Sequence, residues 1–300
     1  MSACQRPPKQ PLELIPTGAD VLAQIDVASI AARVHPDALA RPLSREPLAA
    51  AVFTALAECE LPPARWTRVA IGLDDDRGLA LAIAGPGVGQ PARWRCAAER
   101  LGTATTPGDP PHAADRVRVT VEREQYLVAE QAGGRAFGVV VGPDLVVWSD
   151  AAWVDATRAL ATGRTKRASP PELAKLTPRL RPHATAWALG RVPPPERTLP
   201  GAPPADGALT FVFQGKLDRG LSASLEVDFE TPAQAAAAAG ELRPLLGASG
   251  WLSRLGAHTD LASSGLDAVR VEAEGTKFRL DVELSDHDLA ALSLPAEPAR

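Results

Sequence analysis

The 300-residue sequence contains few of the side chains that most often carry chemistry. It has three cysteines, one methionine and one tyrosine, and it has no asparagine, which excludes N-glycosylation. No two of its five histidines stand at metal-ligand spacing, so there is no local support for a zinc site. No apolar run approaches the roughly 18 residues that a membrane-spanning helix needs. The histidines are His35, His112, His183, His258 and His287.

The charge balance gives no indication of a nucleic-acid partner. The formal net charge is −4, and both signs are interspersed, so no basic stripe is available to neutralise phosphates. The hydrophobic fraction of 45% and the charged fraction of 23% are typical of a globular protein with a real core. Of the 32 basic residues 27 are arginine, a bias typical of a high-GC genome.

The N-terminal residues predict an exported protein that carries a lipid. Ser2-Ala3-Cys4 has the small-small-cysteine order that ends a bacterial lipobox, and the polar, proline-rich run that follows suits an extended tether. We interpret Met1 as an added start residue on a chain from which an apolar signal segment has been removed. Cys4 would then be lipidated in the cell. The alternative is a cytosolic protein whose fourth residue happens to be cysteine.

The other two cysteines, Cys59 and Cys96, predict a disulfide. They are an even number once Cys4 is set aside. Cys59 ends one expected helix and Cys96 lies in the next, with a hairpin between them. Two helices on the same face of a sheet can bring the sulfurs together, and an oxidising periplasm would keep them bonded. The alternative is a pair of buried free cysteines that pack as small apolar residues. The role is structural in either case.

An internal repeat sets the expected domain organisation. Asp76–Ile83 returns as Asp218–Leu225, and Val117–Glu122 returns as Val269–Glu274. Both pairs occur in the same order, and an alanine-rich helical stretch separates the two motifs each time, which indicates a duplication. We therefore predict a lipobox remnant and tether at 1–17, a first α+β repeat at 18–165 and a second α+β repeat at 166–300.

The repeated residues are typical of turns and strands. Asp-Arg-Gly fits a tight turn in which glycine takes positive φ, and the leucine after it starts the inward-facing row of the next strand. The expected fold class is α+β, with two related halves that are each an antiparallel sheet with helices packed on one face. The expected strands are 19–27, 68–73, 78–84, 116–122, 125–129, 136–141, 145–148, 184–192, 209–216, 221–229, 268–274 and 277–284, and the expected helices are 28–33, 44–59, 92–101, 151–161, a short one after 169, 231–246, 251–257, 260–263 and 286–292.

Three local motifs have a catalytic or binding interpretation that their details contradict. Gly85–Gln90 lies between a strand and a helix, but its glycine spacing is wrong for a dinucleotide loop and nearby prolines remove backbone donors, so we expect a flexible connector. Asp74–Asp76 lacks the spacing of a calcium loop and is expected to be a solvated turn. Ser285–Asp288 are neighbours on one helical turn, where they cannot form a catalytic relay, and Ser285 is explained as a helix cap.

The six tryptophans leave two interpretations open. Exposed tryptophans would mark a binding surface, whereas core filling between helix and sheet is the commoner explanation. They are Trp66, Trp94, Trp148, Trp153, Trp187 and Trp251.

The small-small-cysteine N-terminus, the Pro/Gln tether, the opening segment Ile15–Val21 and the two α+β repeats together resemble uncharacterised lipoproteins of high-GC Gram-negative bacteria. The resemblance spans most of the chain, rests on its general layout, and points to a family without an assigned activity. Glutamine after Cys4 is similar to the outer-membrane-directed type. The resemblance therefore implies the periplasmic face of the outer membrane or the cell surface, with the cytoplasm as the location if the lipobox interpretation is wrong.

We accordingly expect a non-catalytic, lipid-anchored binding or scaffold module without cofactor or metal. Its partners would be the membrane, through the lipid on Cys4, and an unidentified protein. A second hypothesis is a carrier whose two sheets enclose an apolar ligand, and a third is a hydrolase with a spatially assembled site. Exposed apolar patches on the sheet faces favour the first hypothesis, a deep dry cavity the second, and a cleft of titratable residues with perturbed pKa values the third.

Overall fold

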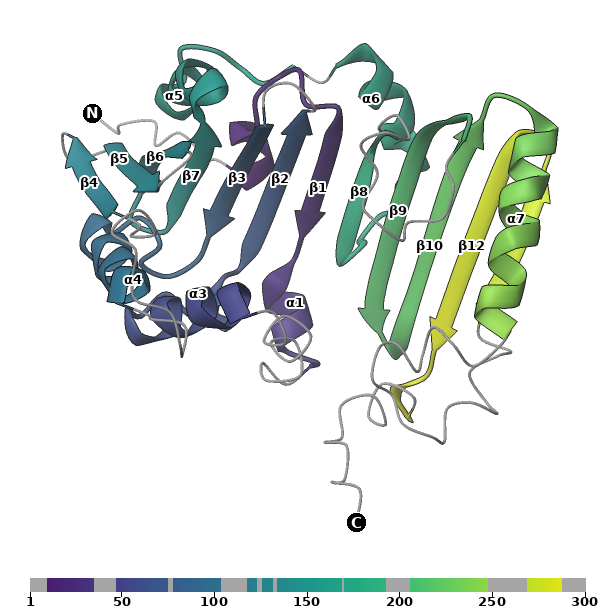
Figure 1. Ribbon diagram of the computed structural model, residues 1–300, viewed down its shortest axis with the longest axis horizontal. Helices are drawn as coiled ribbons and strands as arrows, with labels where there is room; N and C mark the ends of the chain where they lie inside the picture. Colours follow the sequence, from purple (N-terminus) through teal and green to yellow (C-terminus); the bar gives the residue numbers. More distant parts are fainter. Residues whose placement is uncertain are drawn as a thin grey trace, which may run out of the picture. The chain divides into compact units, whose positions relative to one another are not determined.

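The computed structural model describes residues 10–34, 47–74, 78–103, 118–122, 126–131, 134–168, 170–192, 206–247 and 269–287. Contacts between residues divide the chain into two units (Figure 1). The first unit lies within Met1–Ala28 and Leu43–Pro170, and the second within Ser29–Pro42 and Pro171–Arg300. Both units combine helices with antiparallel strands, so the α+β class is confirmed.

The strands of the first unit follow the spatial order β1-β2-β3-β7-β6-β5-β4. Every neighbouring pair in this order is antiparallel, which suits the short connections between them. These strands are β1 (Val21–Ile25), β2 (Arg68–Asp74), β3 (Gly78–Ala84), β4 (Arg118–Glu122), β5 (Tyr126–Gln131), β6 (Gly134–Gly142) and β7 (Leu145–Asp150).

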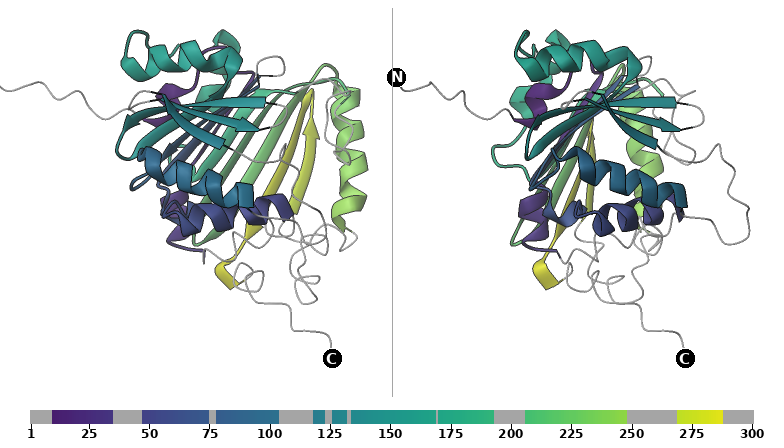
Figure 2. Two further views of the ribbon diagram at one scale, coloured as in Figure 1. Left: turned by 60° about the vertical axis from the view of Figure 1, so that its left-hand side comes forward. Right: turned by 90° about the vertical axis from the view of Figure 1, so that its left-hand side faces the viewer.

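One face of these strands packs against α3 (Pro47–Glu58) and α4 (Pro91–Thr103) (Figure 2). Val69 and Ile83 are partners across β2 and β3, and both lie in the core cluster with Leu56 of α3. Each fully buried aliphatic side chain of this kind stabilises the fold by roughly 1.5–3 kcal/mol. The main core of the first unit therefore forms between the sheet and these two helices.

Helical segments also cover the opposite face of the first sheet. Gly72 alternates with Ile71 along β2, and a Cβ at Gly72 would collide with Ile15, close to Trp153. Ile15 and Trp153 are almost fully buried. The segments on this side are η1 (Pro11–Leu14), η4 (Ala151–Trp153) and α5 (Val154–Thr162). Two further short helices among the described residues are α1 (Val27–Ala31), which spans the boundary between the two units, and η2 (Pro63–Arg65).

The expectation that helices pack on only one face of each sheet is therefore wrong. In the first unit both alternating rows of the central strands are apolar or small. Ala70, Ala80, Ala82 and Val147 are buried on the side away from α3 and α4. A sheet that is covered on both faces produces continuous apolar runs rather than strict alternation.

The strands of the second unit follow the order β8-β9-β10-β12-β11, again with antiparallel neighbours. Leu225 of the central strand β10 lies opposite Phe213 of β9 and Leu280 of β12. These strands are β8 (Ala186–Arg191), β9 (Ala208–Asp218), β10 (Gly220–Phe229), β11 (Val269–Glu274) and β12 (Lys277–Leu284).

Helices lie on both faces of the second sheet as well. The helix α7 (Pro232–Gly247) packs on a cluster that contains Phe229 and Phe278, with Val227 partly buried against it. The neighbours of Val227 on β10, Glu226 and Asp228, instead bond to Arg179 of η5 (Thr177–Arg179), which follows α6 (Pro171–Leu176). Since successive residues of a strand point to opposite faces, α7 and η5 lie on different sides.

The glycines of the two repeated turns have the conformation that the sequence predicts. Gly78 has φ +89° and Gly220 has φ +117°, both in the region that favours glycine. Space is restricted too, because a Cβ at Gly78 would collide with the Asp150 carboxylate, which accepts a hydrogen bond from Leu79 N at 2.7 Å. At Gly220 the obstacle is the carbonyl oxygen of Leu284.

Most of the remaining expected elements appear within a few residues of their predicted limits. The helix predicted over 44–59 is α3, which begins at Pro47, the first-turn position that suits proline. The helices predicted at 251–257 and 260–263 lie outside the described residues, as does 288–292 of the last predicted helix.

Candidate functional site

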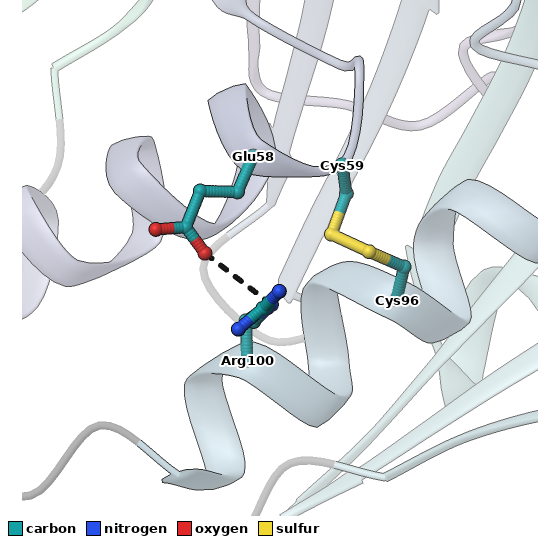
Figure 3. Close-up of a disulfide and its surroundings, with 4 residues drawn as sticks. All are labelled: Glu58, Cys59, Cys96 and Arg100. Atoms are coloured by element: carbon teal, nitrogen blue, oxygen red, sulfur yellow. Dashed lines mark ion pairs between the residues drawn. A yellow bond between two sulfur atoms is a disulfide. The ribbon is translucent and has the colours of Figure 1, made fainter.

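A disulfide joins Cys59 and Cys96, and Figure 3 shows it between two neighbouring helices. Cys59 follows the last turn of α3 and Cys96 lies in α4, with their Cα atoms 5.7 Å apart. Cys59 is 4% exposed and belongs to the core cluster of the first unit. The link therefore fastens two core helices together, and its buried position gives it a structural role rather than that of a reactive thiol pair.

The contacts around the disulfide are of two kinds. An ion pair joins Glu58 and Arg100 at 3.3 Å, but both side chains are about half exposed, so the pair contributes little to stability (Figure 3). On the core side, Trp94 and Trp148 meet edge to face with ring centroids 5.1 Å apart. Trp94 also donates a hydrogen bond to the Val88 carbonyl at 2.6 Å.

The tryptophans lie mostly in the core. Trp153 is 2% exposed, and Trp66, Trp94 and Trp148 are partly buried against the cluster of the first unit. Core filling, the commoner of the two interpretations, therefore accounts for these four. Trp187 on β8 is half-buried, and Trp251 lies outside the described residues.

The glycine-rich loop after β3 is a connector, as expected, and its backbone is hydrogen-bonded to the segment between β6 and β7. Gly85 N and Gly89 N donate to the carbonyl oxygens of Asp144 and Pro143, at 3.0 and 2.9 Å. Gly87 N donates to the Asp144 carboxylate at 2.7 Å. A Cβ at Gly89 would collide with the backbone of the turn between β6 and β7. Close backbone approach thus explains this glycine, and the backbone donors are used within the protein.

The other residues singled out by sequence are not assembled into a site in the described part of the chain. Cys4, Asp75 and Asp76 lie outside it, as do His35, His112 and His258. Asp286 and His287 are exposed, and His183 is an exposed turn residue with φ +67°. Among the residues that the structure describes, no group of histidine, cysteine and carboxylate side chains is arranged to hold a metal ion.

A cluster of charged residues that the sequence analysis did not identify lies on the second sheet. Arg179 donates to Glu226 Oε2 at 2.7 Å and to Asp228 Oδ2 at 2.5 Å. Thr210 Oγ1 donates to the same Asp228 oxygen at 2.8 Å. The three charged side chains are only 22–25% exposed. This cluster ties η5 to β9 and β10.

The electrostatics of this cluster are those of a structural ion pair. Burial disfavours the charged forms of Asp228 and Arg179, but their mutual hydrogen bond and attraction outweigh it. The pKa of Asp228 therefore lies below its ordinary value, and the pKa of Arg179 lies above its own. Both groups stay charged near neutral pH, so neither is suited to exchange protons as a general acid or base.

Two depressions lie on the polar face of the second sheet. One, of about 130 Å³, is lined by Arg181, Arg270, Arg279 and neighbouring polar residues. The other, of about 210 Å³, is lined mainly by Glu226, Glu272, Glu274, Lys277 and Phe278. Their charged linings do not match the deep dry cavity expected of a carrier.

Large apolar side chains are exposed on the strands of both units. Leu73 and Leu79 are partners on β2 and β3, and they are 43% and 41% exposed. They continue a row with half-buried Val21 on β1, and we call these three residues the apolar row. In the second unit, Leu209 and Phe213 on β9 are 47% and 37% exposed. Alternation predicts such positions to face a core, so only the structure shows that they are partly uncovered.

No helix in the described part of the chain is long and apolar enough to cross a membrane.

Comparisons with known proteins show similarity in the fold only. No protein-family model matches the sequence, and no curated protein matches it significantly. Among solved structures, TP0453 in crystal form III is similar with a TM-score of 0.50 and 12% sequence identity, over 96% of this chain and 98% of that chain. Crystal forms IV and I of TP0453 give TM-scores of 0.46 and 0.44, each at 12% identity, over 95% of this chain and 97% of that chain. At this identity the likeness concerns the arrangement of helices and strands.

Proposed function

We propose that this chain is a non-catalytic, lipid-anchored protein of the cell envelope that acts as a binding or scaffold module. The observation that carries the proposal is the partial exposure of large apolar side chains on the strands of both units: Leu73, Leu79, Leu209 and Phe213. Grouped apolar side chains at a surface are typical of a site that contacts a partner. In this proposal the partner binds to the sheet faces at these residues.

The lipid anchor is proposed from the N-terminal sequence, with Cys4 as the modified residue. The disulfide between Cys59 and Cys96 supports export, because such bonds persist in oxidising compartments and are rare in the cytosol. Mass spectrometry of the protein from its native host tests the proposal directly. Diacylglyceryl on Cys4 is the expected result. An unmodified Cys4 together with two free thiols would contradict both the anchor and the location.

We also infer that the two units arose by duplication. The glycines of the two Asp-Arg-Gly motifs, Gly78 and Gly220, are the first residues of β3 and β10. The second repeated motif falls on the last strand of each order, β4 and β11. Omitting β6 and β7 from the first order leaves β1-β2-β3-β5-β4, which corresponds to β8-β9-β10-β12-β11. A hairpin adds two antiparallel strands, so its insertion preserves the direction of every neighbour.

The duplication can be tested on the unit that lacks the added hairpin. We expect a separately produced 171–300 segment to give a cooperative thermal transition and a dispersed NMR spectrum, because a duplicated unit carries its own core. A segment without cooperative unfolding would contradict the inference.

Photo-crosslinking tests the binding module. A photo-reactive residue is placed at position 79 or 213 in the full chain in its host, with exposed position 151 as the matched control. We expect a discrete protein adduct from positions 79 and 213 and none from 151. Equal crosslinking from all three positions, or none from 79 and 213, would count against binding through the apolar side chains.

The carrier hypothesis makes a different prediction with the same residues. Native mass spectrometry of the purified protein would show a co-purifying apolar molecule, and Leu79→Asp or Phe213→Asp would remove it. Protein adducts without such a molecule would favour the scaffold. A bound molecule without protein adducts would favour the carrier instead.

A further inference from the structure

Three arginines from separate elements line one depression on the second sheet. Arg181 follows η5, Arg270 lies on β11 and Arg279 on β12, and together they border a volume of about 130 Å³. Arg279 alternates along β12 with Phe278, which packs in the cluster of α7. The arginine side chains therefore belong to the polar face of the sheet, opposite α7.

The charges around this depression do not cancel. Arg279 and Asp281 form an ion pair, with the shortest contact at 2.7 Å. The other charged residues of the lining are Arg181, Arg270 and Glu283. The lining therefore has three arginines and two carboxylates, a net charge of +1. Within the described part of the chain, neither Arg181 nor Arg270 has a carboxylate partner. The two guanidinium groups are thus available to a ligand.

The backbone at Arg181 is held in place. Arg181 N donates to Gln214 Oε1 at 2.6 Å, and Gln214 is only 5% exposed. Two residues earlier, Arg179 is fixed by Glu226 and Asp228. Because these contacts restrain the segment before a ligand arrives, binding loses less conformational freedom than it would on a free loop.

We propose that this depression binds a phosphate group through the guanidinium groups of Arg181 and Arg270. Ser222 also lines it and can donate a further hydrogen bond. Guanidinium forks match phosphate geometry, and donors from several elements suit a tetrahedral group with more than two oxygens better than a planar carboxylate. The source of the phosphate is a soluble phosphate ester or a lipid headgroup. This site lies on the polar face and does not depend on the apolar contacts of the proposed function.

Isothermal titration of the full chain with inorganic phosphate, at constant ionic strength, tests the site. We expect saturable binding that Arg181→Gln or Arg270→Gln weakens about tenfold each, because each guanidinium donates charge-assisted hydrogen bonds to the phosphate oxygens. Glu283→Gln removes a repelling carboxylate and is expected to tighten binding. Arg95→Gln removes an exposed arginine of α4 and serves as the matched control without effect.

Two further measurements distinguish the sources of the phosphate. One is titration with glycerol 3-phosphate, and the other is flotation with phosphatidylglycerol vesicles against phosphatidylcholine vesicles. If flotation with phosphatidylglycerol vesicles requires Arg181 and Arg270, the ligand is a lipid headgroup. If only the binding of glycerol 3-phosphate requires the two arginines, the ligand is a soluble phosphate ester. The proposal is overturned if no saturable binding is observed, or if Arg181→Gln, Arg270→Gln and Glu283→Gln all leave the binding unchanged. Circular dichroism verifies that each variant is folded.

Discussion

Breaking the disulfide between Cys59 and Cys96 is expected to destabilise the first unit strongly. The bond joins residues 37 apart in sequence. Closing a loop of that length removes conformational entropy from the unfolded chain worth about 3–4 kcal/mol at 25 °C. For a unit of this size the corresponding fall in Tm is about 10 °C.

The assay compares urea unfolding of the oxidised protein, the reduced protein and the Cys59→Ala/Cys96→Ala variant. Tryptophan fluorescence reports mainly on the first unit, which contains four of the six tryptophans, and Trp94 and Trp148 pack against the same core cluster as Cys96. We expect the reduced protein and the double variant to lose similar amounts of stability, because both lack the covalent link. A loss confined to the variant would instead point to packing of the removed sulfur atoms.

A matched control separates the covalent bond from its neighbours. Arg100→Gln breaks the exposed ion pair with Glu58 beside the disulfide and is expected to cost about 0.2–1 kcal/mol. If reduction lowers the free energy of unfolding by less than about 1 kcal/mol, the loop-closure reasoning is refuted. The oxidised bond would then not be a significant source of stability for the α3 and α4 layer.

Two further predictions concern stability. Gly78→Ala and Gly220→Ala are each expected to lower the free energy of unfolding by about 1–3 kcal/mol, because both combine positive φ with an obstructed Cβ position. Gly240→Ala in α7, where the added Cβ meets nothing, is expected to raise it by about 0.5–1 kcal/mol, and equal effects of Gly78→Ala and Gly240→Ala in thermal unfolding would contradict this account. The pKa of Asp228 is lowered in the folded protein, so its stabilising contribution is complete above the unfolded pKa of about 3.9 and is lost as pH falls through the folded value. Stability measured by urea unfolding should therefore fall more steeply with acidification in the wild type than in Asp228→Asn, and identical slopes would exclude this role.

The sequence predicts the individual elements well because they depend on local patterns. Alternating apolar residues and an Asp-Arg-Gly turn predict the hairpin that the structure shows as β2 and β3. Cysteine number and the helix–hairpin–helix order indicate the pairing of Cys59 with Cys96, which the structure contains. Both inferences use residues that are near one another in the chain.

The layering could not be predicted in the same way, because it depends on which rows of each strand are covered. Ala70 and Gly72 are too small to signal burial by hydrophobicity, yet Gly72 is where Ile15 and Trp153 approach the sheet. The reverse holds for Leu73 and Leu79, which have strong apolar character and are still over 40% exposed. Residue type describes what a side chain prefers, whereas coverage depends on distant segments that reach it.

On the charged face of the second sheet, the strand register determines which charged residues become neighbours. Ser222, Ser224, Glu226 and Asp228 alternate with apolar residues along β10, so the sequence alone indicates one polar face. Pairing then places Arg279 opposite Glu226 and also opposite Glu272, while Asp281 falls opposite Arg270. A slip by one residue would move every charge on β12 to the face that packs against α7. The burial of Phe278 beneath α7 therefore fixes the register. By fixing the register, the apolar packing on one face determines which arginines meet on the other.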